Sequence, residues 1–185
     1  NWSATAKRDV AKAANDNIRL FDMKARWRTD AVEWNASVLD SLNHLQYYKD
    51  TEWTVCSPQT AGNFSAVAYY FGKMLQDSLQ VPVGLICNVK KSTDKLQRHP
   101  YEPCYLYESG ILPLQQFPIK GIIWYQGESN AHNREAHEKL FKLLVDSWRK
   151  NWEDNELPFY YVQLSSIDRP SWPWFRDSQR RFLTQ

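Results

Sequence analysis

The sequence predicts an α/β fold in which a mainly parallel sheet is covered by helices. Two observations support this class. Strand-like apolar runs alternate with helix-like amphipathic segments, and the second half of the chain follows the order strand, helix, strand. In addition, residues 121–125 form a short apolar and aromatic run that gives way to a polar turn, as a buried parallel strand does. Because ligands bind at the carboxyl ends of such strands, we expect the chemistry in that turn.

The composition is that of a globular protein. A length of 185 residues suffices for one core, so we expect a single domain over residues 1–185. Apolar residues make up 43% and charged residues 24% of the sequence, which excludes a predominantly disordered chain. The 23 basic and 21 acidic residues include no basic run, so we expect no nucleic-acid partner.

No segment approaches the ~20 apolar residues that a membrane span requires. The first residues, Asn1-Trp2-Ser3-Ala4, are neither an initiator methionine nor a signal peptide, so we expect the native N-terminus to lie upstream.

The N-terminal part predicts a helix followed by a strand. Residues 4–14 are rich in alanine with interleaved charges, as in a helix, and residues 15–17 should end it. Residues 18–23 alternate apolar and polar side chains, as in a strand. Residues 27–48 fit neither period, so we expect an irregular, polar segment there.

The middle of the chain predicts an extended segment, a helix and a buried strand. Residues 53–56 should be extended, and Thr60 or Asn63 should cap a helix over residues 64–79. The apolar run at 81–87 should form a buried strand. The side chains of the helix that recur at helical spacing should face the core: Val67, Tyr70, Phe71, Met74 and Leu75.

The remaining elements complete the alternation. Residues 88–103 are polar and end in prolines, so they should lie at the surface, and residues 105–114 should form a short helix. After the strand at 121–125, residues 132–152 predict an amphipathic helix and residues 158–164 another buried strand. The face of the longer helix that should be buried consists of Leu140, Leu143, Leu144, Ser147 and Trp148.

Neither cysteines nor histidines predict a metal site. Cys56, Cys87 and Cys104 lack a metal-binding spacing, and three buried thiols are the favoured interpretation, although one pair could be bridged in an oxidising compartment. His132 and His137 are five residues apart and so do not share a helical face, as the His-Glu-x-x-His arrangement requires. We therefore expect no metal and no cofactor.

Aromatic side chains are abundant, with 9 Trp, 10 Tyr and 8 Phe. Residues 172–175, Trp-Pro-Trp-Phe, have a loop-like composition. Rings in loops can stack on the C–H faces of sugars, although packing is the commoner use of tryptophan. Carbohydrate contact and core packing are both open for these rings.

The turn after the strand at 121–125 carries the candidate catalytic groups. Residues 127–131, Gly-Glu-Ser-Asn-Ala, differ from the nucleophile elbow Gly-x-Ser-x-Gly only at the last position. Ser129 is therefore a candidate nucleophile, although capping the following helix or supporting the turn is its commoner role. The amide of Gln126 can donate to an oxyanion or make a structural hydrogen bond, whereas Glu128 can hold the turn as an acceptor.

Residues 121–130, Gly-Ile-Ile-Trp-Tyr-Gln-Gly-Glu-Ser-Asn, resemble the third conserved block of sialate O-acetylesterases, which belong to the SGNH-hydrolase superfamily. The resemblance implies a flavodoxin-like three-layer α/β/α sandwich and an enzyme that removes O-acetyl groups from sialic acid or related sugars through a serine. It also implies an acetylated sugar as partner and a secreted or periplasmic location. Further segments that fit it are 17–21, 53–79, 81–86, 113–130 and 172–181.

Three blocks that this resemblance implies have no counterpart here. The family's serine lies in a Gly-Gln-Ser-Asn-Met block, its histidine lies in an Asp-x-x-His block, and a glycine-rich loop follows the strand equivalent to 81–87. We therefore expect the nucleophile and the base outside these residues and the sequence to be incomplete, with a junction near residues 87–90. The alternatives are a catalytically inactive sugar-binding relative and a different serine hydrolase that uses Ser129.

The resemblance also assigns roles to residues that are present. Gln126 and Gly127 would hold the oxyanion of the tetrahedral intermediate, and Glu128 would support the turn. In the Gly-x-Asn block of the superfamily the asparagine lies two residues after the glycine, whereas Asn130 lies three residues after Gly127. Which amide points at the oxyanion therefore stays open. The side chains that would line the sugar site are Trp174, Arg176 and Asn130.

Overall fold

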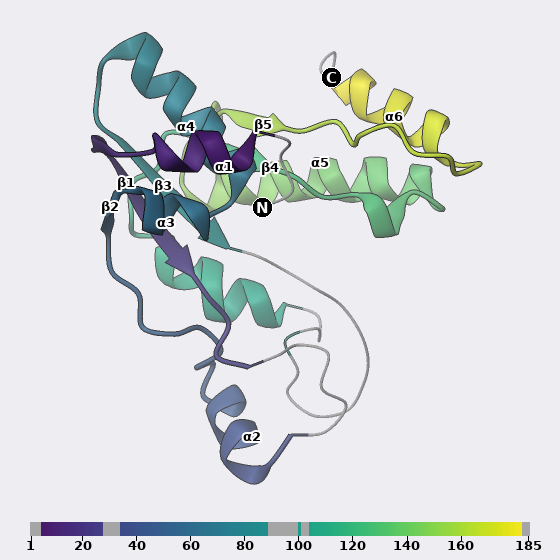
Figure 1. The fold of residues 1–185 in the computed structure, drawn as a ribbon. Coiled ribbons are helices and arrows are strands. Elements are labelled where there is room, and N and C mark those ends of the chain that lie inside the picture. The colour runs from purple at the N-terminus through teal and green to yellow at the C-terminus, as the bar shows by residue number, and fades with distance from the viewer. Residues whose placement is uncertain (1–4, 28–33, 89–99, 101–103, 183–185) are drawn as a thin grey trace. The chain divides into compact units, whose positions relative to one another are not determined.

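A computed structural model shows an α/β architecture and describes residues 5–27, 34–88, 100 and 104–182. The chain forms two compact units, Asn1–Leu114 and Gln115–Gln185 (Figure 1). The prediction of one domain over residues 1–185 stays a prediction. The predicted junction near 87–90 and most of the polar segment at 88–103 lie outside the described residues.

A three-stranded mixed sheet forms the centre of the first unit and consists of β1 (Asn15–Met23), β2 (Thr54–Cys56) and β3 (Val83–Asn88). β1 lies in the middle, antiparallel to β2 and parallel to β3, so this sheet is not wholly parallel. Alternation along β1 buries Ile18 and Leu20. The prediction that residues 15–17 end the preceding helix is wrong, because Asn15 already pairs with Cys56 of β2.

Three helices accompany this sheet: α1 (Ala6–Ala11), α3 (Pro58–Gly62) and α4 (Ala66–Leu79). α4 packs on β1 and β3, α3 contacts β2, and α1 packs on α3. Ser57 caps α3 in a capping box with Thr60. Ser65 caps α4, because its hydroxyl accepts a hydrogen bond from the Ala68 N–H. The prediction that Thr60 or Asn63 caps the long helix is therefore wrong.

The buried face of α4 is rotated from the predicted one. Tyr70 and Met74 are exposed, whereas Tyr69, Gly72 and Gln76 are buried. The reason lies at Gly72, where a Cβ would be 2.6 Å from Cδ1 of Leu85 in β3. The helix comes closest to the sheet where it lacks a side chain, and this contact sets its rotation.

The expectation of an irregular segment over residues 27–48 is also wrong, because α2 (Ala36–Asn43) lies within it. Asn35 caps this helix by accepting a hydrogen bond of 3.0 Å from the Val38 N–H. Leu42 is fully buried, and its carbonyl accepts a hydrogen bond of 2.9 Å from the Tyr105 hydroxyl. The helix is too short for its period to stand out in a segment rich in aromatic and charged residues.

The predicted short helix over 105–114 is helical but irregular. A π-helical turn, Tyr107–Ile111, is followed by a 3-10 turn, Leu112–Leu114. Pro113 lacks an N–H group, which disfavours a continuous α-helical ladder there.

The second unit confirms the predicted order of strand, helix and strand. Its elements are β4 (Ile122–Trp124), the 3-10 turn η3 (Glu128–Asn130), α5 (Arg134–Asn151), β5 (Phe159–Tyr161) and α6 (Trp172–Arg181). β4 and β5 are parallel, with Ile122 opposite Phe159. The ring of Phe141 in α5 packs edge-on against Phe159 and Tyr161. This aromatic packing joins the helix to the sheet.

The predicted face of α5 is wrong at three positions, because Leu140, Leu143 and Ser147 are exposed. Leu140 and Leu143 are 61% and 62% exposed, whereas His137 and Phe141 are buried. Phe141 stacks on Phe182 at 4.7 Å between ring centroids, so aromatic packing rather than the leucines determines which face is buried.

Residues 172–175 begin α6 rather than a loop. Pro173 lies in the first turn of the helix, where its missing N–H costs nothing. Trp172 and Phe175 are buried, and Trp174 is 66% exposed. The tryptophans of this segment thus divide between core packing and the surface.

The three cysteines are free thiols. Cys56 and Cys87 are buried, as expected. Cys104 is exposed, which corrects the interpretation of three buried thiols.

Candidate functional site

The turn that follows β4 packs directly on α6. Gly127 is buried and has a φ of 146°, a conformation that side chains with a Cβ rarely adopt. A Cβ at this position would lie 2.8 Å from Cε1 and 3.0 Å from Cζ of Phe175. Only glycine therefore allows the turn to lie this close to the helix.

Two N–H donors at this turn have no acceptor among the described residues. The side-chain nitrogen of Gln126 and the backbone N–H of Gly127 donate to nothing in the described part of the chain. The side-chain oxygen of Gln126 accepts a long hydrogen bond of 3.4 Å from the Asn130 amide. The carboxyl end of β4 thus carries two donors that are available to a bound anion or carbonyl oxygen.

Asn130 connects this turn to a buried histidine. Its backbone N–H donates to the Gly127 carbonyl at 2.9 Å, and its Nδ2 lies 3.1 Å from Nδ1 of His137. The His137 ring lies 4.7 Å from the ring of Phe175 and is buried. This burial lowers the pKa of His137 below its ordinary value.

From the sequence we considered His137 only as a metal ligand, and its contact with Asn130 was not predicted. One signal was present: His137 is four residues before Phe141, so the two share a helical face. The contact with Asn130 depends on how the turn packs on α5, which spacing alone does not reveal.

Ser129 and Glu128 are both exposed in η3. The cap of α5 is Asn133, whose side-chain oxygen accepts a hydrogen bond of 3.2 Å from the Ala136 N–H. The expectation that Ser129 caps this helix is therefore wrong. Among the described residues the Glu128 carboxylate has no hydrogen-bond or ion-pair partner, and its support of the turn stays a prediction.

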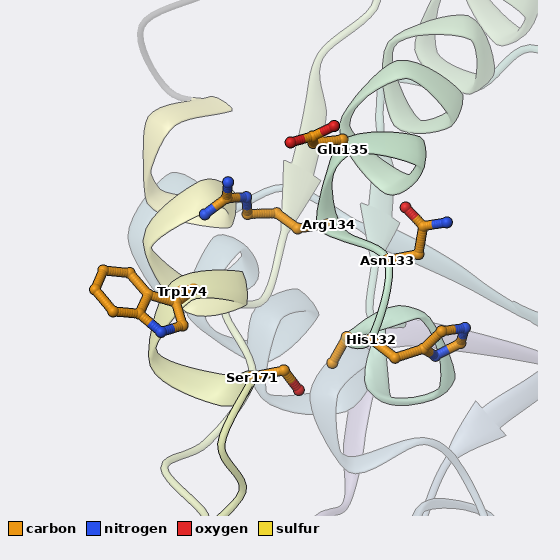
Figure 2. Close-up of a pocket in the computed structure, with 7 residues that line it drawn as sticks. His132, Asn133, Arg134, Glu135, Ser171 and Trp174 are labelled. Carbon is orange, nitrogen blue, oxygen red and sulfur yellow. The ribbon is translucent and has the colours of Figure 1, made fainter.

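Trp174 lines a shallow pocket of about 270 Å³ beside the start of α5. The pocket is formed by Ala131, His132, Asn133, Arg134, Glu135, Ser171 and Trp174. Figure 2 shows the Arg134 side chain reaching from α5 towards α6, whereas the His132 ring points away from Trp174. An exposed indole beside a guanidinium and a carboxylate can offer a sugar both a stacking surface and hydrogen-bond partners.

Arg134 is the cationic side chain of this pocket. It forms no ion pair within the described ranges. Its charge nevertheless reaches α6, because the pKa of Asp177 is lowered first by the hydrogen bond from Arg180 and also by the charges of Arg181 and Arg134.

Arg176 does not line the pocket. Its Nε donates to the Leu164 carbonyl at 2.8 Å, and its Nη1 donates to the Ser166 hydroxyl at 2.8 Å. The Gln163 amide donates to the Arg176 carbonyl at 2.7 Å. The structure thus separates Arg176, which holds the chain after β5 against α6, from Trp174, which faces the pocket.

The described residues offer neither a metal-binding cluster nor a membrane-spanning helix. Within those ranges, no three His, Cys, Asp or Glu side chains lie close enough together to hold a metal ion. No helix in the same part of the chain is long and apolar enough to cross a bilayer.

Comparison with known proteins gives consistent matches. A family model described as carbohydrate esterase, sialic acid-specific acetylesterase, matches residues 2–185. Sialate O-acetylesterase of Mus musculus is 28% identical over 219 residues, which cover 83% of this chain and 38% of the mouse protein. The Homo sapiens protein of the same name is 29% identical over 153 residues, covering 63% of this chain and 29% of its own length.

A solved structure also matches. The crystal structure of a carbohydrate acetylesterase from Xanthomonas citri superposes with a TM-score of 0.70 at 28% identity. The match covers 98% of this chain and 43% of the other. The chain thus spans less than half the length of each of these relatives.

Within the region that the two proteins share, the mouse protein is longer than this chain. The alignment runs over 219 residues, more than the 185 of this chain, although only 83% of the chain takes part. The mouse protein therefore has residues inside the aligned region that have no counterpart here.

Proposed function

Because this chain belongs to the carbohydrate esterases of the sialic acid-specific acetylesterase family, we propose that the protein removes O-acetyl groups from sialic acid or a related acetylated sugar. The observation that carries this proposal is the pair of N–H donors on Gln126 and Gly127, at the carboxyl end of β4, that have no acceptor within the part of the chain that the structure describes. An acetyl ester needs such donors when its carbonyl oxygen becomes an oxyanion.

The proposed reaction is acyl transfer. A serine hydroxyl loses its proton to a histidine and attacks the acetyl carbon, and the electron pair of the carbonyl bond moves onto oxygen. The N–H groups of Gln126 and Gly127 would then donate to this oxygen, and one such donor is worth about 2.7–4 kcal/mol. Collapse breaks the bond between the acetyl carbon and the sugar oxygen, and this oxygen takes the proton from the histidine to leave as a hydroxyl. Water, deprotonated by the histidine, then attacks the acetyl-serine ester, and acetate leaves as the serine oxygen takes the proton back.

The serine, the glycine-rich loop and the histidine of this mechanism belong, in our proposal, to segments that these 185 residues lack. One junction would lie near residues 87–90. The mouse alignment supports missing internal segments, because the relative has unmatched residues between aligned ones. The nucleophile and base therefore have no residue numbers here.

The complete domain would be an SGNH-type, flavodoxin-like α/β/α sandwich. Its support is the parallel pairing of β1 with β3 and of β4 with β5, together with helices between the strands. The antiparallel pair of β1 and β2 would be the exception in such a sheet.

Trp174 is our candidate for sugar contact, because its indole is exposed at the pocket with Arg134 and Glu135. Arg176 would contribute indirectly by fixing α6, which carries Trp174, against the chain after β5. Asn130 would orient Gln126, and Glu128 would support the turn. We also propose a secreted or periplasmic location, which rests on the family resemblance alone.

Acetate release from O-acetylated sialic acid and from an aryl acetate tests this function. We expect the full-length protein to release acetate from both and the isolated 185-residue chain to release it from neither. Release by the isolated chain that Ser129→Ala abolishes would show that Ser129 is the nucleophile. No release by the full-length protein, with retained sugar binding, would identify an inactive sugar-binding relative.

A further inference from the structure

Three side chains of the second unit form a series of hydrogen bonds. Nδ2 of Asn130 lies 3.4 Å from Oε1 of Gln126 and 3.1 Å from Nδ1 of His137. A side-chain amide nitrogen carries two hydrogens and can only donate. Nδ1 of His137 must therefore accept, so the ring carries its proton on Nε2.

The other neutral tautomer of His137, with its proton on Nδ1, would turn the Gln126 amide the other way. A proton on Nδ1 of His137 would need an acceptor, so Asn130 would have to turn its oxygen towards the ring. That oxygen would then also face Gln126, which would have to turn its own nitrogen inward to donate. Gln126 would then present an oxygen, instead of N–H groups, to a bound substrate.

We propose that His137 is a positioning residue, which as a neutral ring with its proton on Nε2 holds Asn130, and through it Gln126, with the Gln126 N–H groups available for the oxyanion. This inference rests on the proposed function, which supplies the oxyanion. His137 does not touch the substrate in this scheme. It sets the direction of an amide that does.

The surroundings of His137 favour the neutral ring. Phe175 of α6, Phe141 of α5 and Phe182 lie 4.7, 6.1 and 6.1 Å from it, between ring centroids. Removal from water disfavours a charge, and accordingly burial lowers the pKa of His137.

Among the described residues, Glu138 is the one charged group that shifts the pKa of this ring. Glu138 on the same helix opposes the lowering of the His137 pKa, and its carboxylate is paired with Arg181 of α6 at 3.5 Å. From β5, the hydroxyl of Tyr161 donates to the Gln179 carbonyl. The aromatic rings thus outweigh the single carboxylate, and the ring stays neutral near neutral pH.

Nitrogen-15 NMR of the imidazole rings in the 185-residue chain reads the tautomer directly. At pH 7.5 we expect a protonated Nε2 and a bare Nδ1 for His137, and Ser129→Ala should leave this pattern unchanged. A proton on Nδ1 at this pH would overturn the proposal. On acidification, the Gln126 side-chain signals should shift with the midpoint of the His137 titration, and independent behaviour would count against the relay.

Asn130→Asp offers a sharper variant, because a carboxylate can only accept. We expect the proton of His137 to move to Nδ1 and the pKa of the ring to rise. An unchanged tautomer and midpoint would show that position 130 does not control the ring.

In the full-length enzyme, His137→Phe keeps the aromatic packing and removes the acceptor. We expect kcat to fall by roughly 10²-fold with little change in KM, because the loss is that of one oxyanion donor. Unchanged kcat would refute a positioning role. Failure of the proposed function would look different, since the wild-type enzyme would then release no acetate while the NMR result would stand.

Discussion

Gly127 and Phe175 are in direct contact, and a Cβ on Gly127 would lie 2.8 Å from Cε1 of the ring. Gly127→Ala must move this ring or the turn and also strain a backbone with a φ of 146°. We expect the free energy of unfolding to fall by about 1–3 kcal/mol. Gly62→Ala is the control, because its Cβ would meet only Val10 at 3.4 Å. Urea unfolding measures both, and an equal loss in the two variants would contradict the close contact.

Substitutions of Arg176 and Trp174, which both lie in α6, should differ in their effect on the free energy of unfolding. Arg176→Ala removes donors to the Leu164 carbonyl and the Ser166 hydroxyl, so we expect a loss of about 1–2 kcal/mol. Trp174→Ala removes a side chain that is 66% exposed and should change the free energy of unfolding by less than about 0.5 kcal/mol. If Trp174→Ala proved the more destabilising in urea unfolding, the assignment of Arg176 to structure and Trp174 to the pocket would be reversed.

The thiols should differ in reactivity. Cys104 is exposed, whereas Cys56 and Cys87 are buried, and burial raises the pKa of Cys87 to about 11. We expect a thiol reagent at pH 8 to modify Cys104 rapidly in the native protein and the other two only in denaturant. Cys104→Ser should abolish the rapid phase. A rapid phase that survives in this variant would mean that a second thiol is accessible.

His137 should make stability depend on pH on the acid side of neutrality. Its pKa is lowered in the folded state, so between that lower pKa and about 6.5 the unfolded chain binds more protons than the folded one. The free energy of unfolding should therefore be fully retained above pH 6.5 and decrease as the pH falls through this window. The difference between wild type and His137→Phe in urea unfolding isolates this dependence. A difference that stays constant from pH 7.5 to pH 5 would argue against a neutral, buried ring.

Strands were the most predictable elements because each is a compact apolar run with polar or glycine residues at its ends. The runs at 81–87 and 121–125 became β3 and β4. Helix faces were less predictable, since period alone placed Leu140 and Leu143 in the core of α5. Their exposure results from aromatic packing around Phe141, which no local pattern encodes.

The site was predictable only in part. The polar turn after a buried strand pointed to Gln126, and the family resemblance added Gly127. That the two hold an oxyanion stays a prediction. The partner of Asn130 was not recognisable, since His137 lies seven residues further on and on a different element. Ser129 was assigned a capping role that belongs to Asn133, four residues later.

Turnover of O-acetylated sialic acid by the full-length protein, before and after Gln126→Leu, bears most directly on the proposed oxyanion site. Leucine has a similar size but no N–H to donate, so we expect kcat to fall by roughly 10²–10³-fold while KM changes little. Ser129→Ala, made in parallel, should retain near-normal turnover. An unchanged kcat in Gln126→Leu would contradict the assignment of Gln126 to the oxyanion and, with it, the catalytic interpretation of this turn.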